Sequence, residues 1–275
     1  MMCDQDNEFS LLRLVPTVTR ARDFRLYTKN RQRLVDLWQN GGAAILGHTP
    51  PSILKELKNT ASRGLYAPFP HFLEDRYIKA LSRIFPGRNF RLYAAPPPKL
   101  ETLIADRYAA LWRPFLDSNA PLSVPENSPP VLIPVVPGIQ GWREGLPCGL
   151  CVLAVTPDFE KTNDVPSGDF LSPVLLAVAA RGLYDLIAVV PQRAKLKYSR
   201  VEKALKNNQP VNGRWRRQGI YLTPLQEPSH EEWAALFRRF LEEDFLLPPV
   251  PYQPAILPGV LSPGEEAKLA CLLTE

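Results

Sequence analysis

Two cysteines and three histidines are the residues most easily matched to chemistry. Cys148 and Cys151 form a Cys-x-x-Cys pair, a spacing that zinc sites and redox-active dithiols both use. A closed structural zinc site needs four ligands, but there is no second cysteine pair, and His48, His71 and His230 are far apart in the sequence. We therefore predict no metal site and no redox centre. The two cysteines are interpreted as small apolar residues at the start of a buried strand.

Positive charge gathers in one segment, residues 193–217. It contains nine Lys and Arg residues against one acid, Glu202, so it carries +8, and the rest of the chain carries −3 of the total of +5. With Tyr198 and Trp215 interleaved, such a cluster binds nucleic acid at low salt. The expected contacts are Lys195, Lys197, Arg200, Lys203, Lys206, Arg214, Arg216 and Arg217. The favoured interpretation is a solvated helix face next to a hairpin, and nucleic-acid binding is the alternative.

The N-terminal third predicts one hairpin and two helices. Residues 23–37 alternate apolar and polar on both sides of a polar turn at 28–30, which is typical of a β-hairpin. Thr49 followed by Pro50 predicts an N-cap and a first helical residue, with a helix to about Arg63. A second helix is predicted to end at Phe85. Its expected buried face is Leu73, Tyr77, Ala80, Leu81 and Ile84.

The middle of the chain changes in composition. A short strand is predicted at 89–93, and a helix is predicted after three prolines at 96–98. Residues 117–130 are rich in Pro, Ser and Asn without periodicity, which indicates a loop that joins two parts. Continuous apolar runs at 131–136 and 150–155 have the length of strands buried on both faces. The apolar stripe expected for the helix is Leu100, Leu103, Ile104, Tyr108 and Leu111.

The C-terminal part predicts helices with clear start signals. Residues 171–189 predict a buried helix, and a basic helix follows it. A hairpin is predicted at 213–222. Ser229 with Glu232, and Ser262 with Glu265, have the spacing of capping boxes and predict two more helix starts. The apolar stripe expected for the basic helix is Ala194, Tyr198, Val201 and Leu205.

Length and composition set the class of protein. A chain of 275 residues can bury a substantial core, and 30 prolines indicate many short elements with stiff connections. Helices and strands are mixed without strict alternation, so the expected fold class is α/β or α+β. The most apolar stretch, 170–191, contains Arg181 and Asp185, so no membrane span is predicted. The acidic, polar start differs from a secretory signal, which favours the cytoplasm and reduced cysteines.

One segment matches the pattern of a known family. Residues 36–50 read DLWQNGGAAILGHTP. They resemble the class III pyridoxal-phosphate (PLP) aminotransferases, most closely glutamate-1-semialdehyde aminomutase, in which an aspartate precedes a glycine-rich stretch ending in Leu-Gly-His and a proline. The resemblance implies that the Gly-His step shapes a turn near the subunit contact, so His48 is expected to be structural and not a general base. The matching positions are Asp36, Gly41, Gly42, Leu46, Gly47, His48 and Pro50.

Further stretches agree with the same family in the same order. Gly145 and Pro147 lie in a Gly-Leu-Pro-Cys-Gly run that is similar to the family's Gly-Gly-Leu-Pro-x-Gly, and Ser172-Pro173 is similar to its Asn-Pro helix start. Residues 240–273 are similar to the aminomutase C-terminus. The resemblance implies a fold-type I PLP transferase from which most of the large cofactor-binding domain has been deleted.

The resemblance also implies the domain organisation. The N-terminal hairpin and helices would occupy 1–88, a remnant of the large domain 89–170, and a small α/β domain 171–275. In the family's sheet, the first, seventh and sixth strands are neighbours, so the remnant is expected to keep a sheet of about three strands. The segments expected to form it are 89–93, 131–136 and 150–155.

The same resemblance allows the cofactor chemistry to be tested position by position. The family needs a lysine for the Schiff base, an acid at the pyridine nitrogen and a cup of backbone N–H groups for the phosphate. Gln140 stands at the lysine position, and an amide cannot form an imine. The cup falls at 94–98, whose prolines have no N–H. An acid, Asp169, lies near a position where the family has a phosphate-binding threonine, Gly41 replaces an aromatic residue, and the nitrogen acid would lie in the deleted part.

These absences decide the expected function. We predict a protein with no catalytic residues and no cofactor, acting as a binding or structural protein. A homodimer, or a protein partner, is expected to cover the apolar surface that the deletion exposes. Two alternatives stay open. One is a minimal PLP enzyme that uses Lys99, Lys161 or Lys195, and the other is nucleic-acid binding through 193–217.

Overall fold

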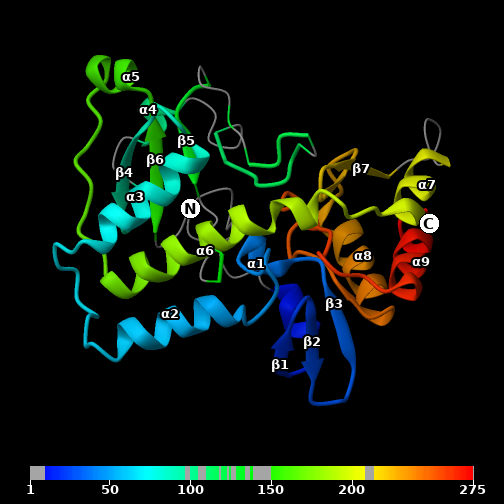
Figure 1. Cartoon of the computed structure of the whole chain (residues 1–275). Coiled ribbons are helices and arrows are strands. Elements are labelled where there is room, and N and C mark those ends of the chain that lie inside the picture. Colours follow the sequence, from blue (N-terminus) through cyan, green and yellow to red (C-terminus); the bar gives the residue numbers. More distant parts are fainter. Residues whose placement is uncertain are drawn as a thin grey trace.

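The described residues form three small sheets together with several helices, so the predicted mixed α/β class is confirmed (Figure 1). The computed structural model describes residues 10–96, 100–104, 110–117, 119–122, 124, 128–133, 137–138, 150–207 and 214–274.

The first sheet joins the two ends of the chain. After a 3-10 helix, η1 (Ser10–Leu14), the strands β1 (Val18–Arg22), β2 (Arg25–Thr28) and β3 (Arg33–Asp36) pair antiparallel, and the C-terminal strand β9 (Phe245–Leu246) pairs parallel with β3. The predicted hairpin is therefore confirmed as β2 and β3. β1 was not predicted, because its side chains are mostly exposed and lack apolar alternation.

Three helices follow this sheet. α1 (Gln39–Gly42) is a single irregular turn, and α2 (Pro51–Ala61) and α3 (Leu73–Ile84) are regular. The predicted cap of α2 is wrong by one residue. Thr49 has a φ of 55°, so it lies in the left-handed region and Pro50 becomes the N-cap. The buried face of α3 is confirmed: Leu73, Tyr77, Ala80, Leu81 and Ile84 are all buried.

The second sheet contains the three strands expected from the family. β4 (Asn89–Tyr93), β5 (Val131–Ile133) and β6 (Cys151–Val155) have the spatial order β4-β6-β5, with β6 antiparallel to both neighbours. Every residue of β5 and β6 is buried, as the continuous apolar runs predicted. Successive residues of β6 contribute to two different core clusters, so both faces of the sheet are covered. Residues 134–136 of the predicted strand lie outside the described residues.

The helix predicted after the prolines is confirmed only for its first turn, residues 105–109 lie outside the described residues, and its predicted end at Leu111 is wrong. α4 (Leu100–Leu103) is one turn long, and Leu111 forms a parallel bridge to Leu132 instead of continuing a helix. The backbone N–H of Trp112 donates to Leu132 O, and the N–H of Leu132 donates to Ala110 O, both at 2.8 Å. Residues 110–112 thus form strand-type hydrogen bonds with the free edge of β5. These bonds outweigh the helical preference that the apolar spacing predicted. Tyr108 lies outside the described residues.

One long helix spans the molecule (Figure 1). α6 (Pro173–Arg193) starts at the predicted Ser172-Pro173 step, packs against α2 and α3, and continues to Arg193, past the predicted end. It is long and apolar enough to cross a membrane by length and composition, but half of its most apolar window is buried inside the protein. The buried-helix interpretation therefore accounts for its apolar composition. A short helix, α5 (Pro157–Thr162), precedes it and was not predicted.

The C-terminal part matches most of its predicted elements. α7 (Ser199–Asn207) precedes the hairpin of β7 (Trp215–Gln218) and β8 (Tyr221–Pro224), and β10 (Ala255–Ile256) completes the third sheet in the order β10-β8-β7. Both capping boxes are present and start α8 (His230–Glu242) and α9 (Pro263–Leu272). Ala194 is exposed at the end of α6, so it does not belong to the predicted stripe of the basic helix.

Candidate functional site

The Asp36–Pro50 turn is organised around one buried carboxylate. Asp36 ends β3 and is 2% exposed. Its Oδ1 accepts from the backbone N–H of Trp38 at 2.9 Å and of Gln39 at 2.7 Å, and its Oδ2 lies 2.8 Å from His48 Nε2. At this distance the imidazole N–H donates to the carboxylate. The first and last parts of the family motif therefore meet in space, and both oxygens of Asp36 are occupied.

Backbone strain is concentrated in the same turn. Gln39 and Asn40 have φ values of 50° and 47°, which non-glycine residues rarely adopt. Gly47 has a φ of 88°, and a Cβ on it would lie 3.1 Å from Asp23 O. The backbone N–H of His48 donates to that same oxygen. Only glycine at position 47 allows the turn to lie this close to Asp23.

A buried arginine fixes the turn to the end of α6. Arg193 is 8% exposed, and its guanidinium donates to Ile45 O. The guanidinium carbon lies 5.2 Å from the ring centre of Phe24 and 5.5 Å from that of Phe115, so aromatic faces stabilise the charge. Burial lowers the pKa of Arg193. Sequence reasoning counted Arg193 in the basic segment, but its charge is in the interior.

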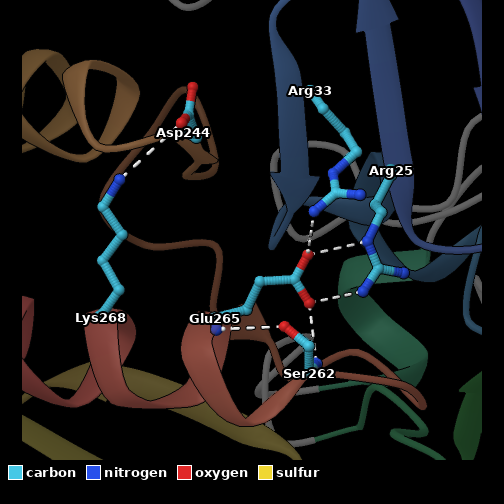
Figure 2. Close-up of polar contacts among 6 residues, drawn as sticks. All are labelled: Arg25, Arg33, Asp244, Ser262, Glu265 and Lys268. Atoms are coloured by element: carbon cyan, nitrogen blue, oxygen red, sulfur yellow. Dashed lines mark hydrogen bonds and ion pairs between the residues drawn. The ribbon is translucent and has the colours of Figure 1, made fainter.

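The two chain ends are joined by a second ionic cluster (Figure 2). Arg25 of β2 binds the Glu265 carboxylate with two hydrogen bonds of 2.9 and 2.5 Å, and Arg33 of β3 reaches it at 3.4 Å. Glu265 also accepts from the Ser262 N–H in its capping box. Nearby, Lys268 pairs with Asp244 at 3.7 Å. Sequence reasoning identified Glu265 as a cap, but nothing in the spacing indicated its arginine partners.

Burial and hydrogen bonding have opposite effects on the pKa of Glu265. Burial would raise its pKa, but the hydrogen bonds from Arg25 and Ser262 outweigh this and hold the pKa below the usual value. The same carboxylate raises the pKa of Arg25. The side chains of Arg25 and Glu265 are only 13% and 11% exposed, so solvent screens this pair weakly. We call this cluster of Arg25, Arg33 and Glu265 the chain-end clasp.

The segment expected to form a phosphate cup is already occupied by an acid of the same chain. Asp169 Oδ2 accepts from the backbone N–H of Ala94 at 2.9 Å, and the Asp169 N–H donates to Leu92 O at 2.7 Å. A Cβ on Gly168 would lie 2.8 Å from Leu92 O, so this segment runs directly against β4. A phosphate at Ala94 would meet a carboxylate instead of a free N–H, and the two negative charges would repel. The described residues do not fit the phosphate of PLP.

Several predicted site residues lie outside the described residues: Lys99, Gln140, Gly145, Pro147 and Cys148. Of the remaining lysines weighed for the Schiff base, Lys161 pairs with Asp158 and has a side chain 76% exposed, and Lys195 is exposed just beyond α6. Pro50 caps α2 and Pro173 is the first residue of α6. Gly41 lies in the strained α1 turn.

The surroundings of Cys151 determine its chemistry. Cys151 is fully buried in β6, and burial raises the pKa of its thiol to about 12, so it stays protonated. Among the described residues, no group of three or more His, Cys, Asp or Glu side chains could hold a metal ion. The described residues thus give Cys151 a packing role.

The basic segment offers fewer groups for binding nucleic acid than its composition suggests. Arg217 pairs with Glu202 at 2.6 Å and lies 5.1 Å from the ring centre of Tyr198. Trp215 is 2% exposed and Tyr198 is 5% exposed, so neither offers a free face for a nucleobase. The aromatic residues that made nucleic-acid binding attractive are core residues here. The exposed cations are Lys195, Lys197, Arg200, Lys203, Lys206, Arg214 and Arg216.

Sequence comparisons reach proteins of no assigned activity. No protein-family model matches the chain. An uncharacterized protein from Treponema pallidum is 27% identical over 304 residues, which cover 90% of this chain and 91% of that protein. An uncharacterized protein from Borreliella burgdorferi is 33% identical over 78 residues, or 28% of this chain.

Comparison with solved structures identifies the fold. Ornithine δ-aminotransferase from Plasmodium falciparum matches with a TM-score of 0.67 at 11% identity, over 94% of this chain and 92% of that chain. Glutamate-1-semialdehyde aminomutase from Pseudomonas aeruginosa matches with a TM-score of 0.65 at 13% identity, over 94% and 86%. Acetylornithine aminotransferase from Elizabethkingia anophelis matches with a TM-score of 0.64 at 11% identity, over 98% of both chains.

The chain therefore has the fold of the PLP-dependent aminotransferases, as the motif resemblance predicted. The structures that it resembles are class III enzymes of that fold, including the aminomutase. Because the matches span 86% to 98% of the solved chains, the predicted deletion of a large-domain part stays a prediction.

Proposed function

We propose that this chain is a reduced relative of the class III aminotransferases that does not hold PLP and works by binding another protein. The fold, the order of the motifs and the β4-β6-β5 sheet support the kinship. The Treponema relative matches 90% of this chain over 91% of its own length, so the two proteins are similar along most of both chains. Similarity of this extent favours a retained protein over a decaying coding sequence.

The contact between Asp169 and Ala94 carries the proposal. In a PLP enzyme of this fold, the segment after the first strand supplies backbone N–H groups to the phosphate. Here that segment begins with Ala94, whose N–H already donates to a carboxylate, and continues into prolines. A carboxylate is a permanent substitute for the anion, because it is covalently part of the chain and is present at high local concentration.

The lysine chemistry points the same way. Gln140 stands where the family spacing places the Schiff-base lysine. Lys161 and Lys195, two of the possible substitutes, are solvated surface cations, and neither lies in an enclosed site that would hold a cofactor.

Borohydride trapping tests this proposal directly. The protein is incubated with PLP, reduced with borohydride and analysed by intact mass and peptide mapping, with a solved class III aminotransferase as the positive control. We expect sub-stoichiometric labelling spread over several exposed lysines. Stoichiometric labelling of one lysine, together with an imine absorption band, would contradict the proposal.

An exposed apolar surface suited to a partner lies on α2 and on the segment that follows it. The α2 helix and the segment between α2 and α3 expose five large apolar side chains, and three of these are aromatic. Exposed apolar surface of this kind is typical of a protein–protein contact. The side chains are Leu54, Leu57, Tyr66, Phe69 and Phe72, and we name them the α2–α3 patch. A second copy of the chain is the proposed partner.

Light scattering coupled to gel filtration tests the homodimer. The wild type is expected to elute with twice the monomer mass, and the double variant Phe69→Ser/Phe72→Ser is expected to shift towards the monomer. The matched control is Val260→Ser, which removes another exposed apolar side chain far from the patch in the sequence. A monomeric wild type would contradict the proposed partner and leave the PLP test unaffected.

A further inference from the structure

A hollow of about 420 Å³ lies between α7 and the edge strand β7. α7 contributes Glu202, Leu205 and Lys206, and β7 contributes Trp215, Arg216 and Arg217. The volume is in the range of small-molecule sites. The hollow is far in sequence from the Asp36–Pro50 turn and from Ala94, so neither part of the family pattern accounts for it.

The charges lining the hollow do not balance. Arg217 is neutralised by Glu202, and its Nε also donates to Gly219 O at 2.8 Å, so it is a fixed part of the wall. Lys206 and Arg216 are exposed, and no described residue forms an ion pair with either. Arg216 is also close enough to Arg113 to help lower the pKa of that arginine, after burial. Lys206 and Arg216 therefore both line the hollow, and no described acid pairs with either.

The backbone of β7 adds uncharged donors to the same place. Leu225 N donates to Arg214 O, so Arg214–Leu225 is a hydrogen-bonded pair and Arg216–Thr223 is the next one. The intervening residues, Trp215 and Arg217, turn their backbone groups away from β8. Because β7 is the edge of its sheet, these N–H groups face outward, where both residues line the hollow. Pro224, which has no N–H, lies opposite Trp215, as this register requires.

The hollow suits a phosphate group better than a nucleobase. The ring of Trp215 packs against Trp233 and Phe240, with centroids 6.0 Å away in both cases, and is not free to stack on a ligand. The available groups are an ammonium, a guanidinium and outward N–H donors, which are the groups that bind phosphate oxygens.

We propose that the hollow between α7 and β7 binds the phosphate group of a ligand, with Lys206 and Arg216 as its charged contacts. The phosphate can belong to a free small molecule or to a nucleic-acid backbone, and the two sources differ in what else they need. A small ligand needs only the hollow. A nucleic acid also needs the neighbouring exposed cations, since its charges are spread along the strand.

Calorimetric titration with pyrophosphate, and separately with a single-stranded oligonucleotide, tests the proposal at low and moderate salt. The test variant is Lys206→Ala/Arg216→Ala. The matched control is Lys195→Ala/Lys197→Ala, which removes the same charge from exposed positions of the same basic segment outside the hollow. Thermal melting without ligand checks that both variants are folded. Because all four side chains are exposed, neither double variant is expected to disturb the core.

The expected result is that pyrophosphate binds the wild type, and that the test variant weakens its Kd by at least about tenfold, while the control changes it by less than about twofold. Three results would overturn the proposal: no pyrophosphate binding to the wild type at low salt, an equal loss in both double variants, or oligonucleotide binding that weakens equally in both. The last two would indicate a diffuse cationic surface instead of a site.

Discussion

The Asp36–Pro50 turn and the Ala94 segment both occupy positions that the aminotransferase pattern assigns, but the turn keeps the residues of that pattern and the Ala94 segment does not. In the turn, three family positions have clear structural roles: both oxygens of Asp36 are occupied, His48 binds one of them, and Gly47 closely approaches Asp23 O. At Ala94, the donor expected for a cofactor is paired with Asp169. Asp36 and Gly47 make contacts that hold the fold together, whereas the Ala94 N–H, which the resemblance assigns to a cofactor phosphate, is paired within the chain.

The two regions also differ in how much their hydrogen bonds contribute to stability. Asp36 is buried, so its hydrogen bonds cannot be replaced by water, whereas Asp169 is exposed and its bond to Ala94 competes with solvent. Mutations in the retained regions should therefore cost much stability, and mutations at Ala94 and Asp169 should cost little. Each of the following experiments tests part of that contrast.

The largest effect is expected from Asp36→Ala. The substitution leaves two backbone N–H groups and the His48 ring without their acceptor, and the cost in unfolding free energy should be about 3 kcal/mol. Urea unfolding followed by circular dichroism measures it. The control is Asp158→Ala, whose side chain is 93% exposed and should cost less than about 0.5 kcal/mol. Equal costs in the two variants would show that the carboxylate does not hold the turn.

The chain-end clasp should respond to both mutation and pH. Glu265→Gln removes the charge that Arg25 and Arg33 share and should cost about 2 kcal/mol near neutral pH. The folded pKa of Glu265 lies below its unfolded value, so its contribution is complete above the unfolded pKa of about 4.3 and is lost as the pH falls through the lowered folded pKa. The difference in stability between wild type and variant should therefore shrink in acid.

Unfolding at a series of pH values measures this difference. Lys268→Ala is the control, because its pairs with Glu243 and Asp244 are about half exposed and should contribute little. A difference between wild type and Glu265→Gln that stays constant down to pH values below about 3 would contradict the assigned role of the Glu265 charge.

Comparing two glycines allows the stability cost of backbone strain to be measured apart from the cost of close packing. Gly47 and Gly64 both have positive φ, 88° and 73°, but only Gly47 has neighbours that a Cβ would meet. Gly64→Ala should cost about 1 kcal/mol from strain alone. Gly47→Ala should cost about 1 kcal/mol more, because Asp23 O must move. The same urea titrations compare them, and a Gly47→Ala cost no larger than that of Gly64→Ala would remove the packing argument for the turn.

The smallest effect is expected at the altered position. Asp169→Ala should cost only about 0.5 kcal/mol, since water can replace an exposed acceptor for the Ala94 N–H. The variant should also fail to bind PLP, because Gln140 and the prolines remain. A cost comparable with that of Asp36→Ala would break the contrast between the two regions, and PLP capture by Asp169→Ala would make Asp169 the sole obstacle to the cofactor.

Sequence reasoning succeeded where local patterns are strong. The hairpin, the buried face of α3, the buried strands β5 and β6 and both capping boxes follow from spacing within a few residues. It failed at α4, where an apolar stripe at helical spacing was overridden by the edge of β5, which bonds to Ala110 and Trp112. A competing partner that is distant in the sequence leaves no local signal.

The candidate sites show the same limit. The motif resemblance predicted the aminotransferase fold and singled out Asp36, His48 and Asp169, but it did not predict that Asp36 binds His48 or that Asp169 binds the Ala94 N–H. The burial of Trp215 and Tyr198, which removes the stacking faces from the basic segment, was equally hidden, because an aromatic residue next to arginines fits a binding surface and a core edge alike.

The amino-acid sequence by itself determined most local elements of this protein and the motifs that resemble the aminotransferases, with Gln140 where that resemblance places a lysine, since these depend on residue types and short spacings. Only the tertiary structure decided which charges are buried, which are paired and which remain free. Ala94 meets Asp169 across 75 residues, and Arg25 meets Glu265 across 240. Contacts at such separations are set by the packing of helices and strands around a shared core, and no spacing along the chain encodes them.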